Sequence, residues 1–417
     1  MNRIILIGNG FDLAHGLPTR YEDFINWYLT SLGKRVFLSN HWREGDNFVS
    51  FKLKDNNSYG SLNSAWYTNG YTSCSDYRQF IEVAKNFPEI CEYSEKSILF
   101  SRICKAIESK GWVDIEREYY DLLRDAVLAA DRCNYSVEEL NSHLHCLQDL
   151  LTEYLLSIRN DIFKYNSELH HLIYGPLQKA DISITKLGDY YCYIERLIDD
   201  ENEYESLLYR YGFESHNIFY LKEELKRLKK LSHDLDEIDE IYLKNIAVPE
   251  NILLLNFNYT NIADNYGREK VATINHIHGG LDHPESMIFG YGDELDDDYK
   301  DLLKQNDNEC LRNIKSIKYL ESDNYRNILQ FIESAPYQVC IMGHSCGNSD
   351  RTLLNTLFEH KNCVSIKPYY YQKKDGSDNY LEIVQNICRN FTDMKLMRDR
   401  VVNKTFCEPL PQSKTNE

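Results

Sequence analysis

The order of apolar and polar positions divides the chain into three stretches, and the first opens with a strand. A short apolar run at residues 4–7 is followed directly by Gly8-Asn9-Gly10. Such a run, bounded by a glycine turn, is typical of a buried parallel strand. Thr19 and Glu22 form a Ser/Thr-x-x-Glu capping pattern that predicts an amphipathic helix at residues 21–32. The predicted order is strand, glycine turn, irregular loop of about eight residues, then helix.

The second stretch is rich in turns at first and helical afterwards. Residues 34–92 combine Asn, Gly and Ser with scattered aromatics, which predicts loops and short helices. From about residue 95 to residue 245, apolar residues recur at helical spacing. The predicted helices include one capped by Ser136, one at 177–198 and one at 221–245. The lysines and arginine at 222–230 alternate with acids, so we expect a solvent-exposed helix face there.

The third stretch returns to short apolar runs that alternate with turns or helices, a pattern typical of a parallel sheet. Expected strands lie at 252–255, 271–277, 287–289, 338–342 and 364–371, and expected helices at 350–360 and 380–391. The first strand has no partner nearby, so we expect it to pair with these late strands. The sequence predicts one α/β domain (1–33 plus 248–408), a mostly helical insertion (34–247) and a flexible tail (409–417).

Composition narrows the class of protein. The chain has 417 residues and a formal net charge of −18, which argues against binding to a nucleic-acid backbone. No signal peptide is evident, nor an apolar run of the roughly 18 residues that a membrane span needs. The 12 cysteines are scattered without a Cys-x-x-Cys pair, which favours reduced thiols over a tetracysteine zinc site. We therefore expect a cytoplasmic protein with no membrane segment and no metal ion.

The glycine turn after the first strand is a candidate anion site. Gly8 and Gly10 can adopt backbone angles closed to other residues, and they let a ligand approach the main-chain amides. Amides near a helix start favour an anion such as a pyrophosphate. The simpler interpretation is a tight turn between strand and loop, because the third glycine of the usual dinucleotide fingerprint is absent.

Two later strands end in polar residues, at the edge where open α/β sheets bind ligands. Asn256 and Asn258 follow one strand, and His276 and His278 follow the next. An imidazole at such a place can act as a base near neutral pH. Two alternatives remain open: histidines satisfied within the strand, or a metal site, since His-x-His presents both rings on one face. No acid cluster lies close in sequence to support a metal.

Three further motifs bear on chemistry. Gly343-His344-Ser345-Cys346-Gly347 fits a nucleophile elbow, but the only later histidine, His360, lies at the far end of the next helix, so we expect no triad. The glycines of 289–293 could shape a ligand wall, and the acidic run 293–298 is typical of a solvated loop. Glu116 could reach the pocket from the insertion or lie on a helix surface, and we favour the surface.

These motifs resemble the AbiH family of bacteriophage abortive-infection proteins and, more distantly, sirtuin-like domains. The resemblance rests on Ile7-Gly8-Asn9-Gly10-Phe11-Asp12-Leu13-Ala14-His15-Gly16-Leu17-Pro18-Thr19, Phe257-Asn258-Tyr259-Thr260, His276-Ile277-His278-Gly279 and Trp112-Val113-Asp114-Ile115-Glu116. The eight residues from Gly343 to Asp350 are similar to a sirtuin-like Gly-x-Ser-x turn followed by an Asp. The resemblance implies a sirtuin-like (Rossmann-type) nucleotide-binding domain interrupted by a large helical insertion.

The resemblance also implies roles for individual residues around NAD. Asn258 would orient the nicotinamide ribose or the attacking water, His278 would be the base, and Asp12 would stand where sirtuins have a serine. The implied nucleotide-binding residues are Gly8, Asn9, Gly10, Phe11, Gly16, Pro18, Asn256, Gly290, Gly343, Ser345 and Asp350. Thr260 stands where many sirtuin-like proteins have an acid, which bears on water activation.

The activity implied by the resemblance is hydrolysis of NAD to nicotinamide and ADP-ribose in antiphage defence. The alternative is a non-catalytic NAD or ADP-ribose sensor, or an interaction protein whose helical insertion binds a phage or host trigger protein. Deacylation on the same fold is less expected, because sirtuin deacylases carry a four-cysteine zinc module that this sequence lacks. Assembly into a homo-oligomer is compatible with the resemblance.

Overall fold

The computed structural model describes residues 1–38, 43–54, 64, 86–89, 91–110, 114–159, 163–231, 247–268 and 270–413. The chain divides into two compact units. The first consists of Met1–Leu17, Asn160–Ile288 and Ser316–Glu417, and the second of Pro18–Arg159 and Phe289–Lys315. The stretch 34–247, which we expected to form one insertion, is therefore shared between the two units.

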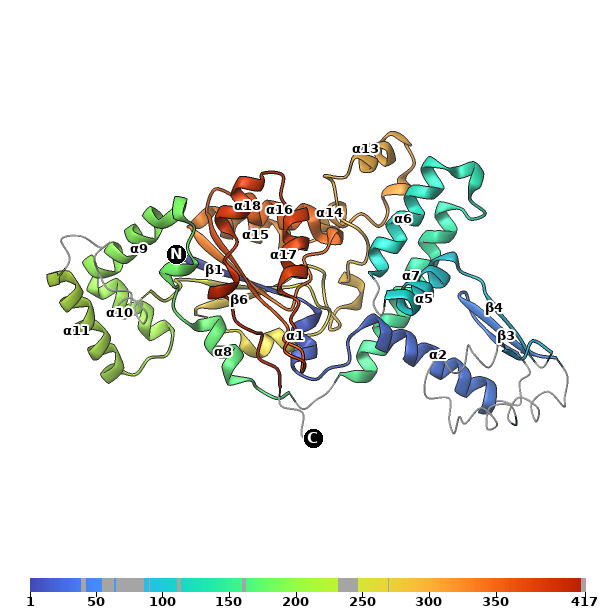
Figure 1. The fold of residues 1–417 in the computed structure, drawn as a ribbon, viewed down its shortest axis with the longest axis horizontal. Coiled ribbons are helices and arrows are strands. Elements are labelled where there is room, and N and C mark those ends of the chain that lie inside the picture. Colours follow the sequence, from blue (N-terminus) through green and yellow to red (C-terminus); the bar gives the residue numbers. More distant parts are fainter. Residues whose placement is uncertain are drawn as a thin grey trace. The chain divides into compact units, whose positions relative to one another are not determined.

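A five-stranded parallel sheet runs through the first unit (Figure 1). Its strands are β1 (Asn2–Ile7), β5 (Ile252–Asn256), β6 (Ala272–His276), β7 (Tyr337–Met342) and β8 (Cys363–Tyr369), in the order β6-β5-β1-β7-β8. β1 lies between β5 and β7, with Ile4 opposite Leu253 on one side and Val339 on the other. The prediction that the first strand pairs with late strands is confirmed.

The strand order reverses once. From β1 the chain order runs outward through β5 to β6, whereas β7 and β8 lie on the other side of β1. In open parallel sheets, ligands bind beyond the carboxyl ends of the strands at the point where the order reverses. In this sheet that point lies between β1 and β7.

Apolar cores cover both faces of the sheet, because alternate residues of a strand point to opposite sides. Ile5 and Ile7 pack in one core with side chains of α8 (Ser167–Tyr174), α9 (Leu187–Asp199) and α10 (Glu201–Arg210). Ile4 and Leu6 pack in the other with side chains of α15 (Asn324–Ser334), α16 (Arg351–Glu359) and α17 (Tyr380–Arg389). The unit also contains α1 (Asn9–Ala14), α11 (Ser215–Leu231) and α18 (Met394–Arg400), and α14 (Lys315–Lys318) begins at the last residue of the second unit.

The prediction of an irregular loop after the glycine turn is wrong. α1 begins at Asn9, so the turn runs straight into a helix of six residues. Phe11 and Ala14 are buried on this helix, and Nδ1 of the His15 ring lies 2.8 Å from the Phe11 carbonyl oxygen. Burial of these side chains outweighs the low helix propensity of Gly10.

Two further predictions fail because backbone amides bond to residues outside the pattern of the expected helix or strand. The helix expected at 177–198 begins at Leu187, because the amides of Leu177 and Ser183 donate to the carbonyls of Ala247 (2.8 Å) and Val364 (3.0 Å). No strand forms at 287–289, where the Met287 amide closes a turn onto Pro284. Of the helix expected at 221–245, residues 232–245 lie outside the described residues, as do residues 414–417 of the expected tail.

The second unit combines helices with a small antiparallel sheet that we did not expect. Its elements are α2 (Tyr21–Leu38), β2 (Arg43–Gly45), β3 (Val49–Leu53), β4 (Cys91–Glu95), α5 (Ile98–Lys110), α6 (Ile115–Leu128), α7 (Val137–Ile158) and α13 (Asp297–Lys304). Alternating buried residues of β3 (Val49, Phe51 and Leu53) were the missed signal. Of the stretch predicted as loops, positions 39–42, 55–63, 65–85 and 90 lie outside the described residues.

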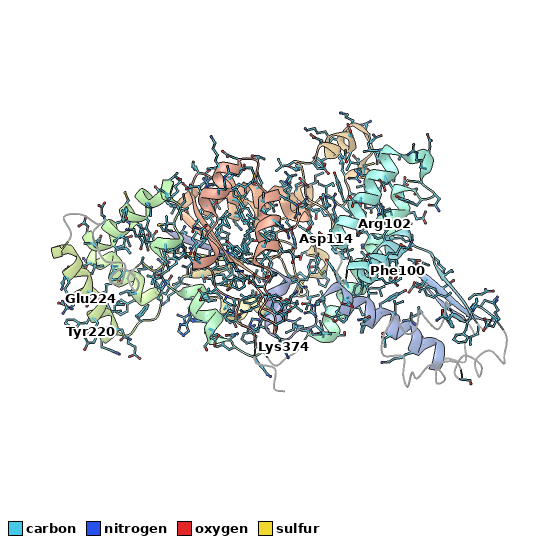
Figure 2. The ribbon with its side chains drawn as sticks, in the orientation of Figure 1. Phe100, Arg102, Asp114, Tyr220, Glu224 and Lys374 are labelled. Atoms are coloured by element: carbon cyan, nitrogen blue, oxygen red, sulfur yellow. The ribbon has the colours of Figure 1, made fainter. Side chains whose placement is uncertain are left out.

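Local signals in the second unit agree with the sequence. Ser136 caps α7 by accepting a hydrogen bond from the Glu139 amide (3.2 Å), as predicted. On α5, Phe100, labelled in Figure 2, packs its ring against Phe48 and Tyr28. None of the helices in the described part of the chain has both the length and the apolar character that a bilayer crossing requires.

One buried cation joins the first strand to α8, and its removal gives a testable prediction. The Arg3 guanidinium donates to the carbonyls of Ile173 (2.9 Å) and Gly175 (2.6 Å), and Arg3 is 4% exposed. Arg3→Met leaves these buried acceptors without their donor, so we expect the free energy of unfolding in urea to fall by about 2–4 kcal/mol. The control Arg227→Met removes an exposed pair with Glu224 and should change it by less than about 0.5 kcal/mol. Equal effects of the two substitutions would contradict the role of Arg3.

Candidate functional site

Two glycine loops lie against each other where β1 and β7 end. The Gly10 amide donates to the Gly343 carbonyl (2.9 Å), and Gly343 has a φ of +79°. A Cβ atom at Gly8 would lie 2.5 Å from His344 Cα, and one at Gly343 would lie 2.1 Å from the Phe11 nitrogen. No side chain fits at these distances, so the contact between the two loops requires glycine at both positions.

The same contact occupies amides that we expected to bind a pyrophosphate. The Gly8 amide donates to the Met342 carbonyl (3.3 Å), the Gly10 amide to Gly343, and the Phe11 amide to the Gly8 carbonyl (2.8 Å). Asn9 is exposed at the start of α1. Anion binding by residues 8–11 therefore stays a prediction, and it requires the loop to exchange these partners.

Asp12 is a buried carboxyl group at this edge of the sheet. It is 2% exposed, and its Oδ2 accepts a hydrogen bond from the Thr260 hydroxyl (2.6 Å). Its Oδ1 is buried without a hydrogen-bond partner. Burial raises the pKa of Asp12 from 3.8 to about 7, against the opposing effects of Thr260 and Asn258. A carboxyl group in this state changes its charge near neutral pH.

The loop after β5 brings Asn258 to the first glycine. The Asn258 amide side chain donates to the Gly8 carbonyl (3.0 Å), while its main-chain amide donates to Asn256 Oδ1 (3.0 Å). Asn256 is 1% exposed and also donates to the Thr260 carbonyl (3.0 Å), so it holds the loop in shape. Thr260 binds Asp12, so an acid at position 260 would place a second carboxylate beside a carboxyl that is already desolvated.

A carboxylate bridges two buried imidazoles beyond β6 and β7. His278 Nε2 lies 3.2 Å from Asp350 Oδ1, and His344 Nε2 lies 3.4 Å from Asp350 Oδ2. The three side chains are between 4% and 8% exposed. The Phe257 ring packs against both imidazoles, with centroid distances of 5.3 Å to His278 and 4.1 Å to His344. His344 lies two residues after the end of β7, and this strand-end position was the signal that sequence reasoning passed over.

The nucleophile-elbow residues do not assemble a triad in the described structure. Ser345 is exposed, and its carbonyl accepts a hydrogen bond from Asn386 (2.8 Å). His360 binds elsewhere, with Nε2 3.1 Å from Glu333 Oε1. Cys346 has a φ of +55° and is fully buried, and burial raises the pKa of its thiol well above the usual range. The thiol therefore stays protonated and is not a nucleophile.

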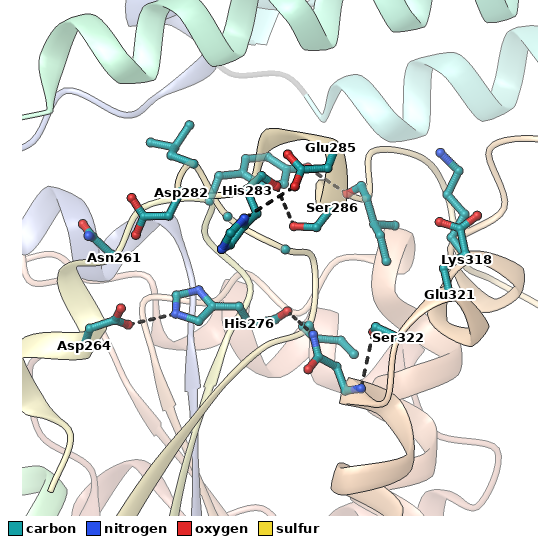
Figure 3. Close-up of a pocket in the computed structure, with 17 residues that line it drawn as sticks. Asn261, Asp264, His276, Asp282, His283, Glu285, Ser286, Lys318, Glu321 and Ser322 are labelled. Atoms are coloured by element: carbon teal, nitrogen blue, oxygen red, sulfur yellow. Dashed lines mark hydrogen bonds and ion pairs between the residues drawn. The ribbon is translucent and has the colours of Figure 1, made fainter. Parts of the chain in front are cut away.

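A cavity of about 470 Å³ opens beside β6, and His276 rather than His278 lies on its wall (Figure 3). His276 Nε2 lies 2.8 Å from Asp264 Oδ1, and Nδ1 lies 3.2 Å from Asn256 Nδ2. Asn256 Nδ2 also donates to a carbonyl, which fixes the orientation of its amide. His276 Nδ1 is therefore an acceptor and Nε2 carries the proton. Both ring nitrogens of His276 are therefore engaged within the chain.

Some implied site residues belong to the second unit. Gly290 is needed there for a close approach, since a Cβ atom would lie 2.0 Å from the Asn313 carbonyl oxygen. The Pro18 carbonyl accepts a hydrogen bond from Tyr154 (2.5 Å). Gly16, in the first unit, has a φ of +83° and open space around it.

Glu116 is not the surface carboxylate that we expected. It is 8% exposed, its Oε2 lies 2.7 Å from Lys315 Nζ, and its Oε1 accepts a hydrogen bond from the Gly290 amide (3.3 Å). Glu116 thus ties α6 to the glycine segment within the second unit. Asp293, at the start of the run expected to be solvated, is also buried. Trp112 and Val113 of the same motif lie outside the described residues.

The structure thus brings together most of the sequence-based site residues of the first unit. The sheet edge at the carboxyl ends of β1, β5, β6 and β7 holds bonded groups that contain Asp12, Asn256, Asn258, His278, Gly343 and Asp350. Ser345 faces solvent, and Gly290 and Pro18 lie in the other unit.

The raised pKa of Asp12 predicts a pH-dependent cost of folding. Between pH 3.8 and 7 the folded state keeps the Asp12 proton and the unfolded state does not, so this group makes stability fall as pH rises. At 1.36 kcal/mol per pKa unit, the loss from pH 5 to pH 8 is about 3 kcal/mol. Asp12→Asn should remove this component, which urea unfolding at both pH values measures.

The control is Asp297→Asn, at a carboxylate that is 93% exposed and ionised in both states over this pH range. Its pH dependence should match that of the unmodified protein. An Asp12→Asn profile that also matches would show that Asp12 is ionised at neutral pH in the folded state.

Comparison with known proteins identifies one family. The model of the family described as "Bacteriophage abortive infection AbiH" matches residues 4–371. Neither a curated protein nor a solved structure matches the chain.

Proposed function

The chain belongs to the bacteriophage abortive infection AbiH family, and we propose that it acts in antiphage defence by hydrolysing NAD to nicotinamide and ADP-ribose. The family match covers most of the chain and supports a role in abortive infection. The reaction rests on the sirtuin-like motifs together with the arrangement of polar groups at the sheet edge.

Asp12 is the observation that carries the proposal. It is a desolvated carboxyl with one unpartnered oxygen, next to Asn258, at the edge where the strand order reverses. Burying such a group costs free energy, and groups of this kind concentrate at functional sites. The edge between β1 and β7 is also where open parallel sheets take nucleotides.

The proposed reaction gives each polar residue a task. The water oxygen bonds to C1′ of the nicotinamide ribose, the C1′–N bond breaks, and nicotinamide leaves as a neutral molecule with the bonding electron pair. Asp12 in its ionised form accepts the proton of the water, and Asn258 orients the water or the ribose. His278 acts as a base toward a ribose hydroxyl. The released proton passes to solvent.

Incubation of the purified full-length chain with NAD tests the proposal by measuring released nicotinamide. Because general acid–base groups contribute roughly 10²–10⁴-fold, Asp12→Asn and His278→Ala should each lower the rate at least 100-fold. Asn258→Ala removes the group that orients the water or the ribose and should lower the rate about 100-fold. Below pH 7 the unmodified rate should rise about tenfold per pH unit as Asp12 ionises, and level off above it. Asp297→Asn is the matched control and should retain the full rate.

A second candidate function is a sensor that binds NAD or ADP-ribose without turnover. The observation in its favour is that His278 is only 3% exposed and that the Gly10 and Phe11 amides have partners within the chain. Calorimetric binding of either nucleotide, weakened by Asn258→Ala and without nicotinamide release, would support the sensor. Absence of both binding and turnover would count against both functions.

A further inference from the structure

We propose that Asp350 is a positioning residue that fixes His278 in the tautomer with its proton on Nε2, so that Nδ1 is its basic nitrogen, while His344 binds the second oxygen of Asp350. This inference rests on the proposed function for its catalytic meaning, because His278 is the base of that reaction. It reassigns Asp350, which the sirtuin resemblance placed on the nucleotide.

The tautomer of His344 follows from its main-chain neighbour. The Cys346 amide donates to His344 Nδ1 at 3.0 Å, so Nδ1 must offer a lone pair. The proton of a neutral His344 is therefore on Nε2, which lies 3.4 Å from Asp350 Oδ2. The tautomer of His344 is thus set by the backbone.

The protonation state of His278 follows from the carboxylate. An unprotonated Nε2 at 3.2 Å from Asp350 Oδ1 would set a lone pair against a negative oxygen in a site shielded from water. A protonated Nε2 makes a charge-assisted hydrogen bond instead. Asp350 then receives one N–H donor on each oxygen, which compensates the burial of its charge. Tyr319, whose hydroxyl lies 3.2 Å from the same Nε2, packs its ring parallel to the imidazole.

The tautomer decides which ring nitrogen of His278 can act as the base. With the proton on Nε2, the basic lone pair of His278 is on Nδ1, the ring nitrogen that does not face Asp350. Asp350 neither touches the reacting atoms nor takes a proton. It orients the imidazole and stabilises the imidazolium that forms when Nδ1 accepts a proton, as an orienting carboxylate does in other base–carboxylate pairs.

Substitution of Asp350 by asparagine tests whether Asp350 sets the tautomer of His278 or only packs against it. An amide of the same shape offers one acceptor and one donor, so it satisfies only one Nε2–H group. His344 keeps its tautomer because the Cys346 amide holds Nδ1. The amide oxygen therefore goes to His344 and the amide NH₂ to His278, which has to move its proton to Nδ1.

The experiment is long-range ¹H–¹⁵N correlation spectroscopy on the full chain with ¹⁵N-labelled histidine, which distinguishes Nε2–H from Nδ1–H rings. The His278 and His344 signals are assigned by their loss in His278→Gln and His344→Leu. We expect both rings as Nε2–H in the unmodified protein, and His278 alone as Nδ1–H in Asp350→Asn. In His344→Leu, His278 should remain Nε2–H because Asp350 still faces it.

Glu333→Gln provides the matched control, because it makes the same carboxylate-to-amide change beside His360, with Oε1 3.1 Å from Nε2. It should alter the signals of His360 and leave His278 and His344 unchanged. The inference is overturned if His278 of the unmodified protein carries its proton on Nδ1. This measurement does not depend on the folding of any variant. An Asp350→Asn spectrum in which His278 keeps its proton on Nε2 also overturns the inference.

The NAD assay tests whether the tautomer of His278 affects catalysis. Asp350→Asn should lower the rate of NAD hydrolysis roughly 10²–10⁴-fold, because the lone pair of His278 moves to the wrong nitrogen. Glu333→Gln should stay within about twofold of the unmodified rate. Expected tautomers without any NAD turnover would support the positioning of His278 and overturn the proposed hydrolysis. Turnover with His278 as Nδ1–H would overturn the positioning and leave the hydrolysis standing.

Discussion

The arrangement at the sheet edge depends on the close approach of two main chains. The loops after β1 and β7 meet through Gly8, Gly10 and Gly343, at separations that exclude a Cβ atom. The Gly8 carbonyl accepts the Asn258 side chain, and the neighbouring His344 carries one of the two imidazoles bound to Asp350. A shift of either loop would therefore displace polar groups supplied by three different strands. The glycines act first by making this contact possible.

The polar groups at this edge show two ways of burying charge. Asp350 receives an N–H donor on each oxygen, so its charge is compensated within the fold. Asp12 has a donor on Oδ2 and none on Oδ1, and its charge is compensated only in part. Folded proteins rarely keep an orphaned buried acceptor. The uncompensated group is therefore the one that a substrate or a water molecule would satisfy.

The sequence predicted the sheet well because its signals are local to each strand. The apolar runs at 4–7, 252–255 and 338–342 became β1, β5 and β7, and strand-end polarity indicated Asn258 and His278. It could not show that the Gly8 and Gly10 amides would bond within the chain, because the partner of Gly10 is Gly343, more than 300 residues away. The link between His278 and Asp350 was invisible for the same reason. α1 and β3 were missed because short elements depend on burial more than on propensity.

The topology of the first unit also sets when it can form during synthesis. β1 is the middle strand, and each of its residues pairs with a β7 residue 335 positions later. At roughly 5–20 residues per second, a ribosome takes on the order of 20–70 s to deliver that partner. During this interval β1 cannot pair with β7. A chain that stops before β7 therefore lacks the strand on one side of β1. An unfinished chain of this family therefore lacks the β7 loop, which holds the glycine loop after β1 in place.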